Sequence, residues 1–232
     1  MIIQGLQKTT LLDFPGKVAC TVFTGGCNFR CPFCHNASLV THIEAGHVIP
    51  EEEIFAYLAR RRGILDGVGI TGGEPLLQKD IAEFCRKVHD LGLLVKLDTN
   101  GSFPERLRPL MEQGLVDYIA MDIKNCRDAY AETCGLADMS AELPKIRESI
   151  QLIMSSVIPY EFRTTVVREL HSKERIEQLA KEISGAKQFF LQTFTDSGDL
   201  IGEGLSAYSA EEMEALLELV KAYIPTAELR GI

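Results

Sequence analysis

The sequence lacks the features of a membrane, secreted or nucleic-acid-binding protein. None of its segments has about 18 consecutive apolar residues, the length that a membrane-spanning helix needs. Its start, MIIQGLQKTT, has neither the basic nor the apolar segment of a secretory signal, so we expect a cytoplasmic protein. Lys and Arg total 24 against 33 acidic residues, and no basic block occurs. This balance argues against binding to nucleic acid or to an anionic membrane surface.

Internal repeats, low-complexity tracts and linker-like stretches are also missing, which predicts a single domain over residues 1–232. Hydrophobic residues make up 46% of the chain, enough for one sizeable core. Seven cysteines are present, and disulfides are rare in a reducing cytosol. We therefore interpret the cysteines as metal ligands, reactive thiols or core residues.

Apolar, β-branched runs alternate with longer amphipathic runs along the chain. Six strands and six helices in strict alternation predict an α/β fold with a parallel sheet and right-handed crossovers. Six units are too few for a closed eight-unit barrel, so an open doubly wound sheet and a partial barrel both remain. In either arrangement, functional residues should follow the C-terminal ends of the strands. The expected strands are 18–24, 67–71, 93–98, 118–123, 160–167 and 189–194, and the expected helices are 51–62, 78–91, 104–113, 141–155, 173–184 and 210–223.

Three cysteines follow the first expected strand with the spacing C-x3-C-x2-C: Cys27, Cys31 and Cys34. Three thiolates this close can bind one inorganic centre if the backbone wraps around it, and Pro32 and two preceding glycines favour such a loop. A structural zinc site needs four ligands, whereas a [4Fe–4S] cluster held by three thiolates keeps one iron open. A zinc site completed by His35, or three unrelated buried cysteines, are the alternatives.

Polar residues also end the next three expected strands. The Gly-Gly-Glu segment 72–74 either lets the backbone approach a ligand closely or forms a simple tight turn. Asp98 and Asn100 offer a carboxylate and an amide, with an Asx-type turn as the alternative. Asp122 and Lys124 point to the same side of their strand by alternation. They form either a binding site or a solvated ion pair.

The cysteine spacing, with an aromatic residue before the last Cys, resembles the signature of the radical S-adenosylmethionine (SAM) superfamily. The resemblance implies a partial (β/α)6 barrel, a parallel sheet with outer helices. It also implies a [4Fe–4S] cluster on the three cysteines, with SAM as the second cofactor. In that superfamily the Gly-Gly-Glu backbone receives the methionine amino group. Further cofactor contacts implied by the resemblance are Phe33, Cys34, His35, Gly73 and Glu74.

Segments 98–101 and 122–124 resemble the activating enzymes of glycyl radical enzymes, including pyruvate formate-lyase activases. In those enzymes the matching segments contact SAM and help to hold a monovalent cation. The resemblance makes Asp98, Thr99 and Asp122 candidate ligands of such a cation. It also implies cofactor contacts for Asp98, Asn100, Asp122, Lys124 and Arg163. For Arg163, pairing with nearby acidic residues is the alternative.

Between residue 6 and about residue 135, the chain most resembles the long form of anaerobic ribonucleoside-triphosphate reductase activating proteins. The similar segments are 6–17, the cluster loop 25–36, 96–101 and 117–124, with residues 1–17 as an N-terminal extension. Pyruvate formate-lyase activases carry a SAM-contacting histidine near the end of the sixth strand, but segment 190–195 has none. Gln192 or Thr195 is the expected substitute. No cysteine-rich insertion follows the cluster loop, so one cluster is implied.

The resemblance implies a radical SAM oxidoreductase. A flavodoxin or ferredoxin would supply one electron, SAM would be cleaved to methionine and a 5′-deoxyadenosyl radical, and a glycine of a partner enzyme would lose hydrogen. The expected partner is anaerobic ribonucleoside-triphosphate reductase. The alternatives are activation of another glycyl radical enzyme, a radical SAM enzyme for a small molecule, such as carboxy-deazaguanine synthase, and an iron–sulfur redox sensor. Core or incidental roles are expected for Cys20, Cys85, Cys126, Cys134, His42, His47, His89 and His171.

Overall fold

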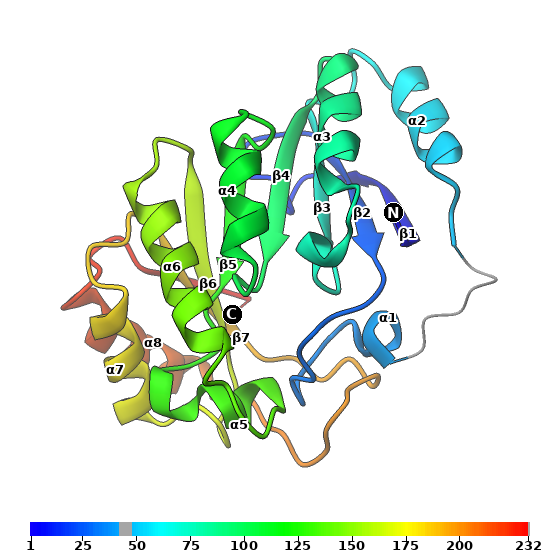
Figure 1. Ribbon diagram of the computed structural model, residues 1–232. Helices are drawn as coiled ribbons and strands as arrows, with labels where there is room; N and C mark the ends of the chain where they lie inside the picture. Colours follow the sequence, from blue (N-terminus) through cyan, green and yellow to red (C-terminus); the bar gives the residue numbers. More distant parts are fainter. Residues whose placement is uncertain (42–47, 232) are drawn as a thin grey trace.

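The computed structural model describes residues 1–41 and 48–231. This part contains one eight-stranded sheet whose strands follow one another in chain order (Figure 1). β1 is antiparallel to β2, and each later pair of neighbours is parallel. The strands are β1 (Ile3–Thr10), β2 (Ala19–Thr24), β3 (Gly67–Gly72), β4 (Leu94–Thr99), β5 (Tyr118–Asp122), β6 (Tyr160–Val166), β7 (Phe189–Thr193) and β8 (Glu228–Arg230).

Helices occupy the connections between the parallel strands. The longer ones begin where the sequence places capping or acidic residues; for example, Ser209 and Glu212 cap α8 reciprocally. The α-helices are α1 (Ala37–Thr41), α2 (Glu51–Arg60), α3 (Ile81–Asp90), α4 (Pro104–Glu112), α5 (Tyr130–Cys134), α6 (Glu142–Ser155), α7 (Lys173–Glu182) and α8 (Ala210–Lys221). Two 3-10 helices are η2 (Pro75–Leu77) and η3 (Arg127–Ala129).

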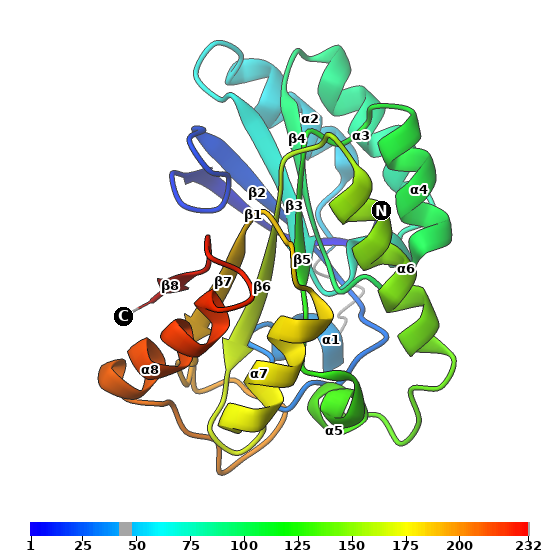
Figure 2. The same cartoon turned by 90° about the vertical axis from the view of Figure 1, so that its left-hand side faces the viewer.

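The strand order settles the choice between the two predicted arrangements. A doubly wound sheet reverses its order at a switch point, whereas the order from β2 to β8 never reverses. Because right-handed crossovers that advance in one direction all fall on the same face, the helices collect on the outside of the sheet. Helices α3, α4 and α6 lie together on one side of β3–β6 in both views (Figures 1 and 2). The predicted partial barrel with outer helices is confirmed.

All six predicted strands and all six predicted helices are present, with ends that differ by up to three residues. The predicted N-terminal extension 1–17 contains a strand that was not predicted, β1, which pairs with β2 along its edge. The run IQGLQKTT has only weak alternation of apolar and polar residues, so its sequence does not predict a strand. The sequence also gave no sign of the three-residue β8 or of the five-residue helices α1 and α5.

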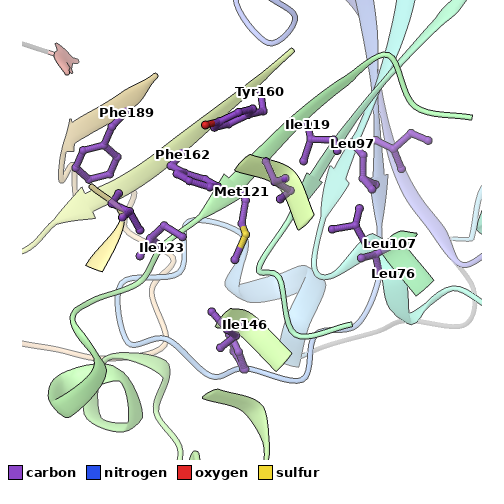
Figure 3. Close-up of a cluster of buried hydrophobic side chains, with 14 of the residues drawn as sticks. Leu76, Leu97, Leu107, Ile119, Met121, Ile123, Ile146, Tyr160, Phe162 and Phe189 are labelled. Atoms are coloured by element: carbon purple, nitrogen blue, oxygen red, sulfur yellow. The ribbon is translucent and has the colours of Figure 1, made fainter. Parts of the chain in front are cut away.

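The hydrophobic core lies between the sheet and the outer helices. Leu97 of β4 and Ile119 of β5 point toward Leu107 of α4, and Ile146 of α6 lies nearby (Figure 3). These four side chains are at most 2% exposed. Burial of the outer sheet face therefore leaves the inner face of the same strands free for polar residues. Within the described ranges, no helix is long and apolar enough to cross a membrane.

Candidate active site

The inner face of the sheet borders a cavity of about 410 Å³. Alternation along the strands places one residue in two on this face, and these inward positions are largely polar. The cluster loop adds its thiols and rings to the same cavity. Inward strand residues that line it are Thr21, Phe23, Gly69, Thr71, Lys96, Asp98, Asp122, Arg163, Thr165 and Gln192, and the loop contributes Cys27, Phe29, Cys31, Phe33, Cys34, His35 and Asn36.

The cluster loop is irregular because its own backbone and Arg30 fold it. The Arg30 guanidinium donates to the carbonyl oxygens of Cys27 and Phe29 at 2.7 and 2.8 Å. The Cys34 amide donates to the Cys31 carbonyl at 3.1 Å, which forms a tight turn around Pro32. These contacts bring the three cysteines to one cavity, as the spacing predicts.

The three thiols differ in their electrostatic surroundings. Burial, reinforced by the charge of Glu74, raises the pKa of Cys27 to about 12. Burial also raises the pKa of Cys34. A hydrogen bond from the Cys134 thiol lowers the pKa of Cys31, which is 7% exposed. Iron binds thiolates, so the positive iron atoms of a cluster would offset the cost of ionising Cys27 and Cys34.

The donor set of the loop fits an iron–sulfur cluster better than a single ion. Across residues 1–41 and 48–231, no three His, Cys, Asp or Glu side chains gather as ligands of one metal ion. A cubane cluster has no such requirement, because its thiolates bind different iron atoms. Cys27, Cys31 and Cys34 line one cavity without gathering around a single point, so they fit a cluster whose thiolates bind different iron atoms better than a zinc ion.

Side-chain amides join the cluster loop to the strand ends. The Asn36 amide donates to the Gly72 carbonyl at 3.1 Å. The Asn100 amide donates to Asn28 at 2.9 Å and lies 3.8 Å from the Cys27 sulfur. Ser102 hydrogen-bonds both Asn28 and Asn100. The Asn100 backbone forms the expected Asx-type turn, since its side-chain oxygen accepts the Ser102 amide at 2.9 Å.

The Gly-Gly-Glu segment packs directly against the cluster loop. Gly72 has φ +110°, and a Cβ on Gly73 would lie 1.9 Å from the Gly26 carbonyl oxygen, so the close approach requires glycine. The Glu74 amide donates to that same oxygen at 2.8 Å. The Glu74 side chain, however, is fully buried and does not line the cavity. The contact of Glu74 with the cluster loop is therefore made by its backbone.

Glu74 instead holds the end of β4 in place. Its carboxylate accepts hydrogen bonds from the Thr99 hydroxyl at 2.8 Å and from the Asn100 amide at 2.7 Å. It also accepts the Leu76 amide at 3.0 Å, which caps η2. Burial raises the pKa of Glu74 to about 7, against the opposing effect of these three donors.

The charged side chains at the ends of β4, β5 and β6 contact one another and form a charged rim. Asp122 accepts Arg163 Nε at 2.9 Å and Lys124 Nζ at 3.1 Å. Asp98 accepts both terminal guanidinium nitrogens of Arg163 at 3.2 Å and the Lys96 ammonium. Burial opposes ionisation, but Arg163 and its neighbouring cations lower the pKa of both carboxylates. Burial also disfavours the charged form of Lys124. The neighbouring Asp122 carboxylate outweighs this effect, so the pKa of Lys124 is raised.

The three candidate cation ligands line the same cavity but have different partners. Thr99 points away from Asp98 by strand alternation, and its hydroxyl donates to Glu74. Asp98 and Asp122 both border this cavity and are also linked through Arg163. The sequence left two alternatives for Arg163, a position at the cofactor or a pairing with nearby acidic residues. In the structure Arg163 lines the cavity and also pairs with acidic residues.

Aromatic rings surround the outer part of the cavity. The His35 ring stacks on Phe194, with ring centres 5.9 Å apart. Phe33 lies 6.0 Å from Lys124 Nζ and meets the His171 ring edge-on. Of the two candidate substitutes for the missing histidine, Gln192 lines the cavity and the exposed Thr195 does not.

Three features of the site were not identified from the sequence. His171 is fully buried and its Nε2 lies 2.7 Å from the Lys124 carbonyl, so it positions that strand end. The Lys96 ammonium donates a hydrogen bond to Asp98 of the charged rim. Cys134 is fully buried and its carbonyl accepts the Arg30 amide at 2.8 Å. Cys126 is buried elsewhere, Cys20 and Cys85 lie in the core as predicted, and His42 and His47 fall outside the described residues.

This fold and cavity have counterparts among known proteins. The model of the radical SAM superfamily matches residues 21–155, more than half of the chain. The chain therefore belongs to the radical SAM superfamily and is an enzyme of that class. Membership implies a [4Fe–4S] cluster and SAM as cofactors.

The relatives include activating enzymes. A protein of Methanocaldococcus jannaschii named as a glycyl-radical enzyme activating enzyme is 32% identical over all of this chain and 96% of its own. The 7-carboxy-7-deazaguanine synthase of Hyperthermus butylicus is 41% identical, over 41% of this chain and 40% of its own. A crystallised domain of pyruvate-formate lyase-activating enzyme from Bacteroides vulgatus has a TM-score of 0.58 at 17% identity. It matches 71% of this chain and 99% of its own, which shows a shared fold.

Proposed function

We propose that this enzyme activates a glycyl radical enzyme by reductive cleavage of SAM. The observation that carries the proposal is one cavity lined by three cluster-loop thiols and by the charged rim of Asp98, Asp122 and Lys124. The full-length similarity to a protein named as an activating enzyme supports the choice of reaction. A redox sensor has no use for a charged rim of this kind beside its cluster.

Cys27, Cys31 and Cys34 would hold the cluster, which when bound supplies the electron that cleaves SAM into methionine and a 5′-deoxyadenosyl radical. The rim would orient the charged methionine part of SAM, because Lys124 can pair with its carboxylate while Asp122 holds the Lys124 ammonium in place. The Gly73 backbone would lie against the methionine amino group.

The rings and amides of the loop would hold the nucleoside and exclude water. Phe33 is buried at the cavity wall, and His35 is stacked on Phe194 at its edge. Asn100, between the Cys27 sulfur and the loop amide of Asn28, fixes the loop against β4. Arg163 keeps Asp98 and Asp122 ionised and in place, so it acts on the cofactor through them.

A glycine of the partner enzyme would donate the hydrogen atom. A sheet that ends at β8 without pairing back to β1 leaves the cavity accessible to a partner loop. We propose anaerobic ribonucleoside-triphosphate reductase as the partner, on the similarity of segments 6–17, 96–101 and 117–124. A flavodoxin or ferredoxin would supply electrons, and the cytoplasm stays the predicted compartment, consistent with seven free cysteines.

Electron paramagnetic resonance tests the proposal. The reconstituted, reduced protein and SAM are incubated anaerobically with each candidate partner, and a glycyl radical doublet is expected on one of them. The matched control is the same mixture with the Cys31→Ala variant. If SAM is cleaved but no partner acquires a radical, a small-molecule substrate is favoured, and the local similarity to a deazaguanine synthase names the first class to try.

A further inference from the structure

Lys96 is a buried cation that the proposed chemistry does not use. It lies on β4 beside Gly69 of β3 and Tyr118 of β5, and it is 2% exposed. Lys96 and Asp98 are two residues apart on one strand, so both point into the barrel. The Lys96 ammonium donates a hydrogen bond to Asp98 Oδ1. A lysine this deeply buried needs a specific charge partner, because burial penalises its ammonium.

Gly69 is the neighbour of Lys96 in the register of β3 and β4, and it also lines the cavity. The nearest atom to a Cβ built on Gly69 is Thr21 Oγ1 at 3.6 Å, so a side chain there would extend into the cavity. The wall of the cavity beside Lys96 is thus formed by a residue without a side chain.

Every carboxylate oxygen of the rim already has a cationic partner. Asp98 Oδ1 accepts Lys96 and Asp98 Oδ2 accepts Arg163. Asp122 Oδ1 accepts Arg163 and Asp122 Oδ2 accepts Lys124. Three cations therefore surround these two carboxylates, and Arg163 also lies 3.8 Å from Glu161 Oε1. A further small cation would have to displace one of these partners to reach a carboxylate oxygen, in a partly buried site where charge interactions are strong.

We infer that the Lys96 ammonium takes the place of a bound monovalent cation beside Asp98, and that this site works without sodium or potassium. An ammonium is a compact point charge with three donors, so it can orient a carboxylate as a small ion does. Its covalent attachment to β4 keeps the charge at the site at any ionic composition. The consequence for cofactor binding rests on the proposed function, but the occupancy of the site does not.

Thermal unfolding of the cluster-free protein tests this inference directly. At equal ionic strength, wild type is expected to unfold at the same temperature in choline, sodium and potassium chloride. Lys96→Met removes the internal cation and leaves Asp98 Oδ1 open, so the variant should unfold at a lower temperature in choline chloride. Sodium or potassium should raise that temperature saturably by about 3 °C, as binding at a weak site would.

Two further variants separate a cation site from general loss of an ion pair. Lys87→Met removes a lysine that pairs with Glu83 at 2.8 Å on the surface, and it should show no difference between the three salts. Lys96→Met with Asp98→Asn should lose the response, because the ligand oxygen is gone. If Lys96→Met does not fold, Lys96→Gln, which keeps a hydrogen-bond donor, takes its place in the comparison.

Two outcomes would overturn the inference. One is saturable, ion-specific stabilisation of wild type, which would mean that a free cation binds beside Lys96. The other is a Lys96→Met variant indifferent to all three salts. Calorimetric SAM titration of the reconstituted protein is read separately: absence of binding in every salt would contradict the proposed function while leaving the unfolding result to judge Lys96.

Discussion

The two faces of the sheet are built from alternate residues of the same strands, but one face forms the core and the other lines the cavity. On β4 and β5 the outward residues Leu97, Ile119 and Met121 are fully buried against helices. The inward residues Asp98 and Asp122 carry charge into a cavity. Because alternation separates the two sets, a residue can be changed on one face with its nearest neighbour in sequence left on the other. The comparison predicts that stability and cofactor chemistry respond to different, interleaved positions.

The largest effect is expected on the inner side, at the cluster loop. Replacing Cys27, Cys31 or Cys34 by Ala removes a thiolate ligand, so reconstitution should no longer give the cubane content of about four irons per chain. Cys20→Ala is the control, since Cys20 points into the core and should keep its iron. Iron analysis with the visible spectrum decides it. A variant that loses one of the three thiols but keeps the cluster would refute the ligand assignment.

On the outer face, Leu97→Ala should lower the free energy of unfolding by about 2–5 kcal/mol, through lost burial and the cavity left behind. Leu97 is fully buried between β4 and the helices. Urea unfolding of the cluster-free protein measures the effect, with Leu97→Met as the volume-conserving control. SAM affinity of the folded, reconstituted variant should be unchanged. A loss of affinity as large as that of an inner-face variant would break the separation of the two faces.

Glu74 connects the two faces of the sheet, and the dependence of protein stability on pH should show its contribution. Its pKa is about 7 in the folded protein and 4.5 in the unfolded chain, so the folded state binds the extra proton between these values. The Glu74 contribution is fully present below pH 4.5 and is lost as pH rises through 7. The stability of wild type relative to Glu74→Gln should therefore fall by roughly 3 kcal/mol across this range.

Denaturant unfolding of the two proteins between pH 4.5 and 8 measures the difference. Glu83→Gln, at an exposed position of α3, controls for general loss of a carboxylate. A flat difference between wild type and Glu74→Gln would mean that the Thr99, Asn100 and Leu76 donors hold the carboxylate ionised despite its burial.

The sequence predicts the two-face pattern well and its connections poorly. The apolar, β-branched runs of β2 to β7 and the C-x3-C-x2-C spacing are local, so they predict the parallel strands and the cluster loop. The contacts of Glu74 and Lys96 depend on which strands become neighbours and on how deeply each side chain is buried. The sequence therefore does not predict that the Glu74 carboxylate accepts hydrogen bonds from Thr99 and Asn100, or that Lys96 pairs with Asp98. β1 was missed because its weak pattern becomes a strand only by pairing with β2.

The smallest of these effects, and the sharpest test of the inner face, concerns Lys124. Its ammonium pairs with Asp122 at 3.1 Å, and its side chain is 18% exposed and lines the cavity. A charge-assisted hydrogen bond to the SAM carboxylate makes Lys124→Ala weaken SAM binding by about 1.5–3 kcal/mol. Asp98→Asn and Asp122→Asn should act in the same direction.

The cluster spectrum should survive all three changes, since none of these residues is an iron ligand. Lys187→Ala provides the matched control, because it removes a lysine far along the chain, after α7, without touching the rim. Isothermal titration of SAM into the reconstituted variants makes the measurement. If all three bind as wild type does, the rim is an internal ion-pair network like the Lys96 pair beneath it. The cofactor would then contact only the cysteine loop and the Gly-Gly-Glu backbone.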